Sequence, residues 1–352
     1  MGLREGVRKR TAALVSALVL VGVVIAGCGG GDDSDGGGES AAESSKPRDV
    51  TVRLDWIVWP EHAGYFVALD KGWYKDEGLN VELREGHGSG ESVQLVAAKK
   101  DTFGTGNPSA LVEAAAKGAP ITMVADPFQD SGYSAAYLPD SGITSPKDLE
   151  GKTFAGVAGS PGYTLFPAFL ESQGIDPDSV KTVTVQAGSE MTGLSSGRFD
   201  AVEWNSFAAP LSKAAGAGEA EVFAYGDYGI ISLGWGIFVH NDTLKDDPEM
   251  VKGFVKASLK GWEYALENPD EAAKIMIATA EKSTIDEPTM AEMIRGLVPL
   301  THTDATEGQP LGCMAVEDWE TMIEFEKKYV GVKDPPPVSE MMTNRLIDGC
   351  EA

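Results

Sequence analysis

The sequence predicts an α/β protein built as two lobes. Short apolar runs typical of strands alternate with helical segments, which indicates a largely parallel sheet covered on both faces. The alternation starts again after about residue 140, as expected for a second unit of the same kind. Roughly 300 residues follow the N-terminal segments, which is large for one hydrophobic core and natural for two. A second unit inserted into the first makes the chain cross between the lobes twice.

The first unit begins after Asp49 with an alternating run. Asn107-Pro108-Ser109 indicates a turn that opens a helix, since proline is favoured in the first helical turn. The strands expected here are 50–54, 80–83, 102–105 and 121–125, and the helices are 64–71, 91–100 and 111–117.

The second unit repeats this pattern and the chain then returns. Its expected strands are 153–157, 182–186 and 200–204, with helices 163–173 and 191–197; a strand 234–240 leads back to long helices 245–268 and 271–282. We place the crossings near Tyr137 and Leu233. Lobe I is then 50–137 plus 234–352, and lobe II is 138–233.

The N-terminus has the pattern of an export signal. Four basic residues precede an apolar run, 12–26, that is too short to span a membrane comfortably. The run ends in Ile25-Ala26-Gly27-Cys28, which resembles the bacterial lipobox. We predict a signal peptide over 1–27 and lipidation of Cys28; a signal anchor with an incidental cysteine is the alternative.

A polar segment follows the proposed lipidation site. Residues 29–45 are mostly Gly, Ser, Asp and Glu, a composition that cannot bury a core and is typical of a flexible tether. We assign 28–49 to the lipidated cysteine and this tether. The folded part is therefore expected at the outer face of the cytoplasmic membrane.

The charge of the chain excludes some partners. The formal net charge is −25, and because residues 1–27 carry four basic residues against one acid, the remainder carries −28. A nucleic acid would need a basic footprint, so none is expected. The four histidines have no metal-ligand spacing, and no phosphate loop or nucleophile motif occurs. We expect no metal and no cofactor, and a monomer.

Two cysteines remain once Cys28 is lipidated. An even pair in an oxidising compartment favours a disulfide between Cys313 and Cys350, with two free thiols as the alternative. The bond would tie the C-terminal tail to the loop near residues 309–312.

Several motifs resemble those of a known family. Leu54-Asp55-Trp56-Ile57-Val58-Trp59-Pro60-Glu61-His62-Ala63-Gly64-Tyr65 is followed by Lys71-Gly72-Trp73-Tyr74. This is similar to the start of the family that includes binders of thiamine pyrimidine precursors and, more distantly, sulfonate, taurine and nitrate binders. Segments 103–108, 116–121, 141–152 and 238–242 fit the same family.

The resemblance implies the two-lobed periplasmic-binding-protein fold of type II, with a ligand held between the lobes. Such ligands lie outside the carboxyl ends of the strands. The expected ligand-binding residues are Asp55, Trp56, Trp59, Glu61, His62 and Asn107 from the first lobe, Ser160, Gly162, Tyr163, Glu203 and Trp204 from the second, and Trp235 at the crossing.

The residue types suggest the ligand. Trp56, Trp59 and Trp204 offer faces for a flat ring, and Asp55, Glu61 and Glu203 can accept hydrogen bonds from ring or amine N–H groups. Core packing is the alternative role for the tryptophans, a turn or cap role for Asp55, and a structural hydrogen bond for His62. Ser160 and Gly162 open a helix whose N–H groups can hold a polar atom.

We therefore predict a binding protein that delivers a planar N-heterocycle, such as a thiamine pyrimidine precursor, to the permease and ATPase of an ABC importer. Riboflavin-like rings, or sulfonate, taurine and nitrate anions, remain alternatives. A sulfonate or nitrate site would call for arginine or lysine, and the quoted motifs carry no arginine beside these acids.

The same family contains thiamine pyrimidine synthases. In those enzymes a lysine and, four positions on, a histidine occupy positions that correspond to Gly106 and Ala110 here, and a cysteine-rich run corresponds to Leu233-Gly234-Trp235-Gly236. These departures and the export signal argue against an enzyme. A sensory or adhesive lipoprotein is a third possibility.

Overall fold

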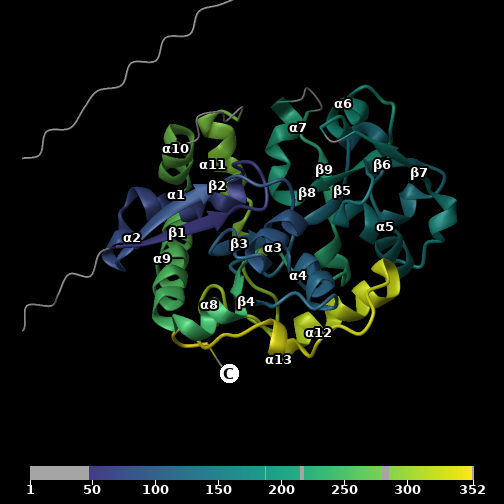
Figure 1. Cartoon of the computed structure of the whole chain (residues 1–352). Helices are drawn as coiled ribbons and strands as arrows, with labels where there is room; N and C mark the ends of the chain where they lie inside the picture. The colour runs from purple at the N-terminus through teal and green to yellow at the C-terminus, as the bar shows by residue number, and fades with distance from the viewer. Residues whose placement is uncertain (1–46, 187, 215–217, 280–284, 351–352) are drawn as a thin grey trace, which may run out of the picture. The chain divides into compact units, whose positions relative to one another are not determined.

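The computed structural model describes residues 47–186, 188–214, 218–279 and 285–350. The predicted signal peptide, lipidated Cys28 and nearly all of the tether lie outside these residues. Across the described part, no helix combines the length and the apolar character that a membrane span requires. Figure 1 shows two sheets with helices around each.

The first sheet has the strand order β2-β1-β3-β10-β4. Its strands are β1 (Arg48–Arg53), β2 (Leu79–Arg84), β3 (Phe103–Gly106), β4 (Ile121–Ala125) and β10 (Gly236–His240). β1 is parallel to β2 and β3, whereas β10 is antiparallel to β3 and β4. The expected largely parallel sheet is confirmed, because β1, β2, β3 and β4 run in the same direction. β10, the strand that returns from the second lobe, runs in the opposite direction.

Helices cover both faces of this sheet, each with its own core. One core joins the sheet to α1 (Ala63–Asp70), α2 (Trp73–Asp76), α9 (Pro248–Glu267), α10 (Pro269–Thr279) and α11 (Glu287–Arg295). The other joins it to α3 (Ser89–Ala97), α4 (Pro108–Ala115), α12 (Val316–Phe325) and α13 (Val338–Met341). α1 and α9 touch through their backbones, since a Cβ on Gly261 would lie 2.1 Å from the Gly64 carbonyl oxygen.

The second sheet has the order β7-β6-β8-β5-β9. Its strands are β5 (Tyr133–Tyr137), β6 (Thr153–Val157), β7 (Lys181–Val185), β8 (Ala201–Asn205) and β9 (Glu221–Ala224). α5 (Pro161–Ser172) packs on one face and α6 (Glu190–Ser195) on the other, while α7 (Pro210–Ala214) lies between β8 and β9 in the chain. The two-lobed α/β architecture with two crossings agrees with the sequence prediction.

The first crossing lies earlier than predicted. The boundary at Tyr137 places 133–137 in lobe I, but β5 pairs with β8 and β9 of the second sheet. The crossing is therefore 126–132, where Asp126-Pro127 and Asp130-Ser131-Gly132 supply the turn residues. β5 is almost wholly buried and shows no alternation of polar and apolar residues, so its pattern gives no sign of a strand.

The long helix expected over 245–268 is α9, and it begins three residues later than predicted, after a separate short helix. α8 covers Asn241–Asp246, and α9 begins at Pro248. Pro248 has no N–H to continue a helix, and the Asp247 side chain accepts a hydrogen bond from the Met250 N–H at 3.2 Å as the cap of α9.

The C-terminal segment contacts both lobes. Cys313 and Cys350 form a disulfide with Cα atoms 5.7 Å apart, as predicted. Between them, α12 packs on the first lobe and continues into a π-helical turn, Glu326–Val330. Phe325 and Tyr329 then pack against the core of the second lobe, so part of the segment predicted for lobe I also contacts lobe II.

Candidate functional site

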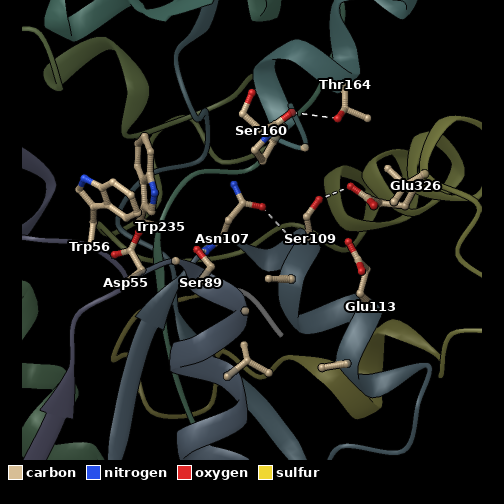
Figure 2. A pocket seen from close by; sticks show the side chains of 18 of the residues that line it. Asp55, Trp56, Ser89, Asn107, Ser109, Glu113, Ser160, Thr164, Trp235 and Glu326 are labelled. Atoms are coloured by element: carbon tan, nitrogen blue, oxygen red, sulfur yellow. Dashed lines mark hydrogen bonds between the residues drawn. The ribbon is translucent and has the colours of Figure 1, made fainter. Parts of the chain in front are cut away.

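A cavity of about 910 Å³ is lined by residues from elements of both sheets. Asp55 follows β1, Asn107 follows β3, and Ser160 lies between β6 and α5, so the cavity is at the carboxyl ends of parallel strands, where α/β proteins bind ligands. Figure 2 shows Trp56, Trp235 and Asp55 on one side of this space and Ser109, Glu113 and Glu326 on the other.

Asp55 is a buried carboxylate that its neighbours hold in place. Its Oδ1 atom lies 3.0 Å from His62 Nε2 and accepts a hydrogen bond from the Thr105 hydroxyl at 3.0 Å. The Trp59 N–H donates to His62 Nδ1 at 3.2 Å, so Nε2 carries the proton and donates to Asp55. Oδ2 has no hydrogen-bond partner among the described residues, and Asp55 lines the cavity.

Glu61 is a second acid at the same place. Only 4% of the residue is exposed, and its Oε2 atom is buried without a hydrogen-bond partner in the described structure. Burial, with a smaller contribution from the Asp55 carboxylate, raises the pKa of Glu61 well above its usual value. Glu61 therefore tends to hold a proton, and its carboxyl group can both donate and accept a hydrogen bond.

Asp55, Glu61 and His62 also satisfy the distance requirement for a cation site, because one ligand atom from each lies within 4.8 Å of the others. The histidine spacing in the sequence gives no hint of this cluster. The imidazole, however, has its Nδ1 lone pair directed at the Trp59 N–H and its Nε2 proton directed at Asp55. It is thus engaged in orienting Asp55 and has no lone pair free for a metal.

Aromatic side chains border these acids. Trp56 is 44% exposed, which leaves much of its ring open to a ligand. Trp235 is buried and packs edge-on against Phe128 and Phe207, with ring centroids 6.3 and 5.7 Å away. Trp59 and Tyr133 also line the cavity. These rings provide stacking surfaces for a planar ligand.

Asn107 connects the cavity to the second crossing. Its side-chain oxygen caps α4 by accepting from the Ser109 N–H at 2.9 Å, and its amide nitrogen donates to the Leu233 carbonyl at 2.7 Å. Both ends of this side chain are therefore in use, and its first role is to fix the start of α4 against the crossing.

Glu203 is held by the start of α5. Its Oε1 atom lies 2.5 Å from the Ser160 hydroxyl, and Oε2 accepts from the Val157 N–H at 3.0 Å. Burial raises the pKa of Glu203, although these hydrogen bonds act in the opposite direction. Gly162 leaves space for the carboxylate, since a Cβ there would lie 2.7 Å from Glu203 Oε1. A carboxyl group of the protein therefore already occupies the start of α5.

The charge around the cavity is strongly acidic. Within the described part of the chain, the lining residues include a single cationic side chain, Lys117, which lies 3.7 Å from Glu113. The lining carboxylates are Asp55, Glu61, Glu113, Glu203 and Glu326. The electrostatics therefore favour ligands that donate hydrogen bonds or carry positive charge.

Eight of the residues predicted from the sequence line this cavity: Asp55, Trp56, Trp59, Glu61, Asn107, Ser160, Glu203 and Trp235. The other four do not. His62 lies behind Asp55, and Gly162 lies behind Glu203. Tyr163 stacks on Phe154, with centroids 6.1 Å apart, and Trp204 packs between two cores while its Nε1 donates to the Ala208 carbonyl at 2.9 Å.

Other lining residues escape prediction from the sequence. Ser109 and Glu113 are four residues apart on α4, and the helix that begins at Asn107 could have indicated both. Tyr133 and Asn205 belong to the second sheet. Glu326 has no local signal, because only the packing of α12 brings it to the cavity. No described residue of 301–312 lines it.

Solved structures share this fold. The periplasmic aliphatic sulphonate binding protein SsuA from Escherichia coli matches with a TM-score of 0.67 over 84% of this chain and 97% of its own, at 14% identity. At that identity the likeness establishes the fold and no more. The chain has the two-lobed periplasmic-binding-protein fold.

Curated relatives are similar over most of their length. A formylaminopyrimidine-binding protein from Halalkalibacterium halodurans is 26% identical over 302 residues, which cover 84% of this chain and 90% of the relative. A 4-amino-5-hydroxymethyl-2-methylpyrimidine phosphate synthase from Legionella pneumophila is 26% identical over 322 residues, which cover 87% and 94%. Both binding proteins and synthases are thus among the relatives.

A family model described as NMT1/THI5 like matches residues 59–272, which is more than half of the chain and includes most of the acids and aromatic rings around the cavity. The protein therefore belongs to the NMT1/THI5-like family.

Proposed function

We propose that the protein binds a planar N-heterocycle, specifically a pyrimidine precursor of thiamine, and delivers it to an ABC importer. The observation that carries this proposal is the composition of the cavity lining: among the described residues, five carboxylates and five aromatic rings accompany one lysine. An aminopyrimidine matches such a lining because it has flat faces for stacking and an edge with N–H donors beside a ring nitrogen acceptor.

Asp55 and Glu61 would bind the polar edge of the ring. The free Oδ2 atom of Asp55 accepts from an exocyclic amine, and His62 and Thr105 keep the carboxylate in place for this contact. Glu61, whose pKa is raised by burial, donates its proton to a ring nitrogen and accepts an N–H in return. Two such parallel hydrogen bonds add specificity as well as affinity.

An anionic ligand is less well supported. The usual anion sites of this fold class, helix N-termini, are occupied here by protein groups: Asn107 caps α4, and Ser160 with Glu203 lies at the start of α5. A sulfonate or nitrate would also meet five carboxylates. The likeness to SsuA concerns the fold and does not outweigh these charges.

Binding without catalysis is the second part of the proposal. The positions that correspond to the lysine and histidine of the synthases are Gly106 and Ala110, and no cysteine occurs in 233–236. The resemblance of the chain to a formylaminopyrimidine-binding protein supports the same role. A synthase activity would need nucleophilic or metal-binding groups that those positions do not supply.

We further propose that the protein is exported and anchored by lipidated Cys28, where the permease and ATPase of the importer would be its partners. The export signal and the sequence Ala26-Gly27-Cys28 support this location. Metabolic labelling with a palmitate analogue tests it: the wild-type chain should incorporate label and Cys28→Ser should not, and equal labelling of the two would contradict the anchor.

A thermal-shift panel tests the ligand class. The full-length protein in detergent is titrated with 4-amino-5-hydroxymethyl-2-methylpyrimidine, thiamine, riboflavin, taurine and nitrate. A ligand at 100 times its Kd should stabilise the protein by about 2.7 kcal/mol. We expect the pyrimidine to raise Tm. A rise in Tm with taurine or nitrate alone would contradict the proposed ligand class. A rise with riboflavin alone would support a planar ring as ligand but contradict the pyrimidine.

A further inference from the structure

The cavity has a second acidic end that the ring-binding residues do not use. Figure 2 places Ser109, Glu113 and Glu326 on the side away from Trp56 and Trp235. Ser109 and Glu113 come from α4, and Glu326 from the π-helical turn after α12. All three line the cavity. A pyrimidine with its amino, methyl and hydroxymethyl substituents has about ten heavy atoms, which at roughly 30 Å³ each need only about a third of this volume.

The Glu326 carboxylate is the informative group at this end. The residue is 4% exposed, its Oε1 atom accepts a hydrogen bond from the Ser109 hydroxyl, and its Oε2 atom is buried without a partner in the described structure. Burial raises the pKa of Glu326, and the nearby Glu113 acts in the same direction. A buried carboxylate oxygen without a donor is costly and is rare in folded proteins unless it serves a function.

The segment that carries Glu326 is fixed from both lobes. Trp319 and Met322 of α12 are buried on the first lobe. On the other side, Lys328 lies 3.2 Å from Glu171 of α5, and the Tyr329 hydroxyl donates to the same carboxylate at 2.7 Å. Glu326 is therefore held at the cavity by packing on both sides, as a preorganised binding group needs to be.

Within the described residues, no cationic side chain forms an ion pair with this carboxylate. Lys117, the single lysine among the described lining residues, has a 78% exposed side chain and contacts Glu113. The Glu326 Oε2 atom can therefore accept a hydrogen bond from a donor that arrives with the ligand, and the acidity of this end favours a donor that is positively charged.

We propose that Glu326 and Ser109 form a second ligand subsite, which binds an amine on an arm of the same ligand whose ring lies at Asp55 and Trp56. The inference rests on the proposed function and narrows it to planar N-heterocycles that carry a flexible, amine-bearing substituent. Ser109 lies inside residues 59–272 and Glu326 lies outside them, so the match to the family model covers only part of this subsite.

The test is a titration calorimetry series on the full-length protein. The probes are 4-amino-2-methylpyrimidines that carry an aminomethyl, 2-aminoethyl or 3-aminopropyl arm at ring position 5, each matched with its hydroxyalkyl counterpart. At one arm length the amine should bind at least about tenfold more tightly than the matched hydroxyl compound, as a charge-assisted hydrogen bond provides. Glu326→Gln should remove this amine preference and leave the hydroxyl compounds within about threefold.

Two further variants isolate the role of Glu326. Glu324→Gln removes a carboxylate from the adjoining end of α12, at a side chain that is 74% exposed and paired with Lys327, so it should keep the amine preference. Ser109→Ala leaves the carboxylate but removes the hydroxyl that orients it, so it should reduce the preference. If Glu326→Gln does not fold, the amine preference of the wild-type protein and its reduction in Ser109→Ala still test the second subsite.

The outcomes separate the two proposals. Binding of the hydroxyl compounds without an amine preference at any arm length overturns the second subsite and leaves the proposed function intact. An amine preference that persists in Glu326→Gln overturns the assignment to Glu326. If no pyrimidine binds, both proposals are wrong.

Discussion

Asp55 and Glu61 on the first-lobe wall of the cavity each keep one carboxylate oxygen without a hydrogen bond, whereas Glu203 on the second-lobe wall has a donor at each oxygen. All three acids line the same space. The difference indicates that the first wall holds binding capacity for a ligand, while the acid on the second wall stabilises its own lobe. Burial next to a ligand site is therefore not sufficient to identify a ligand contact.

The largest expected effect is on affinity, from Asp55→Asn. The Asn oxygen can still accept from His62 and Thr105, but an NH₂ group replaces the free Oδ2 atom and cannot accept an N–H from the ligand. A lost hydrogen bond to a charged group costs roughly 1.5–3 kcal/mol, or about 10- to 150-fold in Kd. Calorimetry with 4-amino-5-hydroxymethyl-2-methylpyrimidine measures it. An unchanged Kd with an unchanged Tm would remove Asp55 from the site.

Glu203→Met should affect stability instead. Methionine keeps the length of the side chain but leaves the Val157 N–H and the Ser160 hydroxyl without their acceptor, which costs about 1–3 kcal/mol in the free energy of unfolding. The Kd for the pyrimidine should change by less than about threefold. Denaturant unfolding measures the free energy of unfolding, and calorimetry measures the Kd. A tenfold loss of affinity with unchanged stability would contradict the structural role assigned to Glu203.

Glu61→Gln should stabilise the free protein at neutral pH. The folded-state pKa of Glu61 is raised, so the folded protein is penalised as pH rises above the ordinary glutamate pKa, near 4.3, and the penalty is complete above the raised value. Glutamine does not ionise. The gain of the variant in the free energy of unfolding should therefore be near zero at pH 4 and grow to about 1 kcal/mol towards pH 8, and thermal unfolding at both pH values measures it.

The matched control for this pH dependence is Glu324→Gln, whose exposed side chain pays no burial cost. An equal Tm gain for Glu61→Gln at pH 4 and pH 8 would show that ionisation of Glu61 does not destabilise the folded protein.

The smallest expected effect concerns the exposed ring of the first wall. Trp56→Phe retains an aromatic face but reduces its area, and stacking interactions are worth about 0.5–1.5 kcal/mol, so the Kd should rise by only about two- to fivefold. Trp204→Phe is the contrasting change: Trp204 packs between cores, so it should lower Tm and leave the Kd unchanged. If Trp204→Phe raised the Kd and Trp56→Phe did not, Trp204 would be the ring that contacts the ligand.

Much of the site could be predicted from the rule that ligands bind at the carboxyl ends of strands. Asp55 and Asn107 follow strands that the sequence reveals, so their position at the cavity could be predicted. The roles of individual side chains could not, because His62 orients Asp55 and Trp204 packs in the core through contacts that only the folded chain creates. Similarly, β5 is buried on both faces and lacks alternation, and Glu326 reaches the cavity only through the packing of α12 and the π-helical turn.

The most direct test of the account is a crystal structure of the protein with 4-amino-5-hydroxymethyl-2-methylpyrimidine. The account predicts the ring beside Trp56 and Trp235, with its amino group within hydrogen-bond distance of Asp55 Oδ2 and its ring nitrogen at Glu61. A ring that instead contacts Glu203 and Ser160 while Asp55 and Glu61 stay without ligand contacts, or a cavity without the pyrimidine, would contradict it.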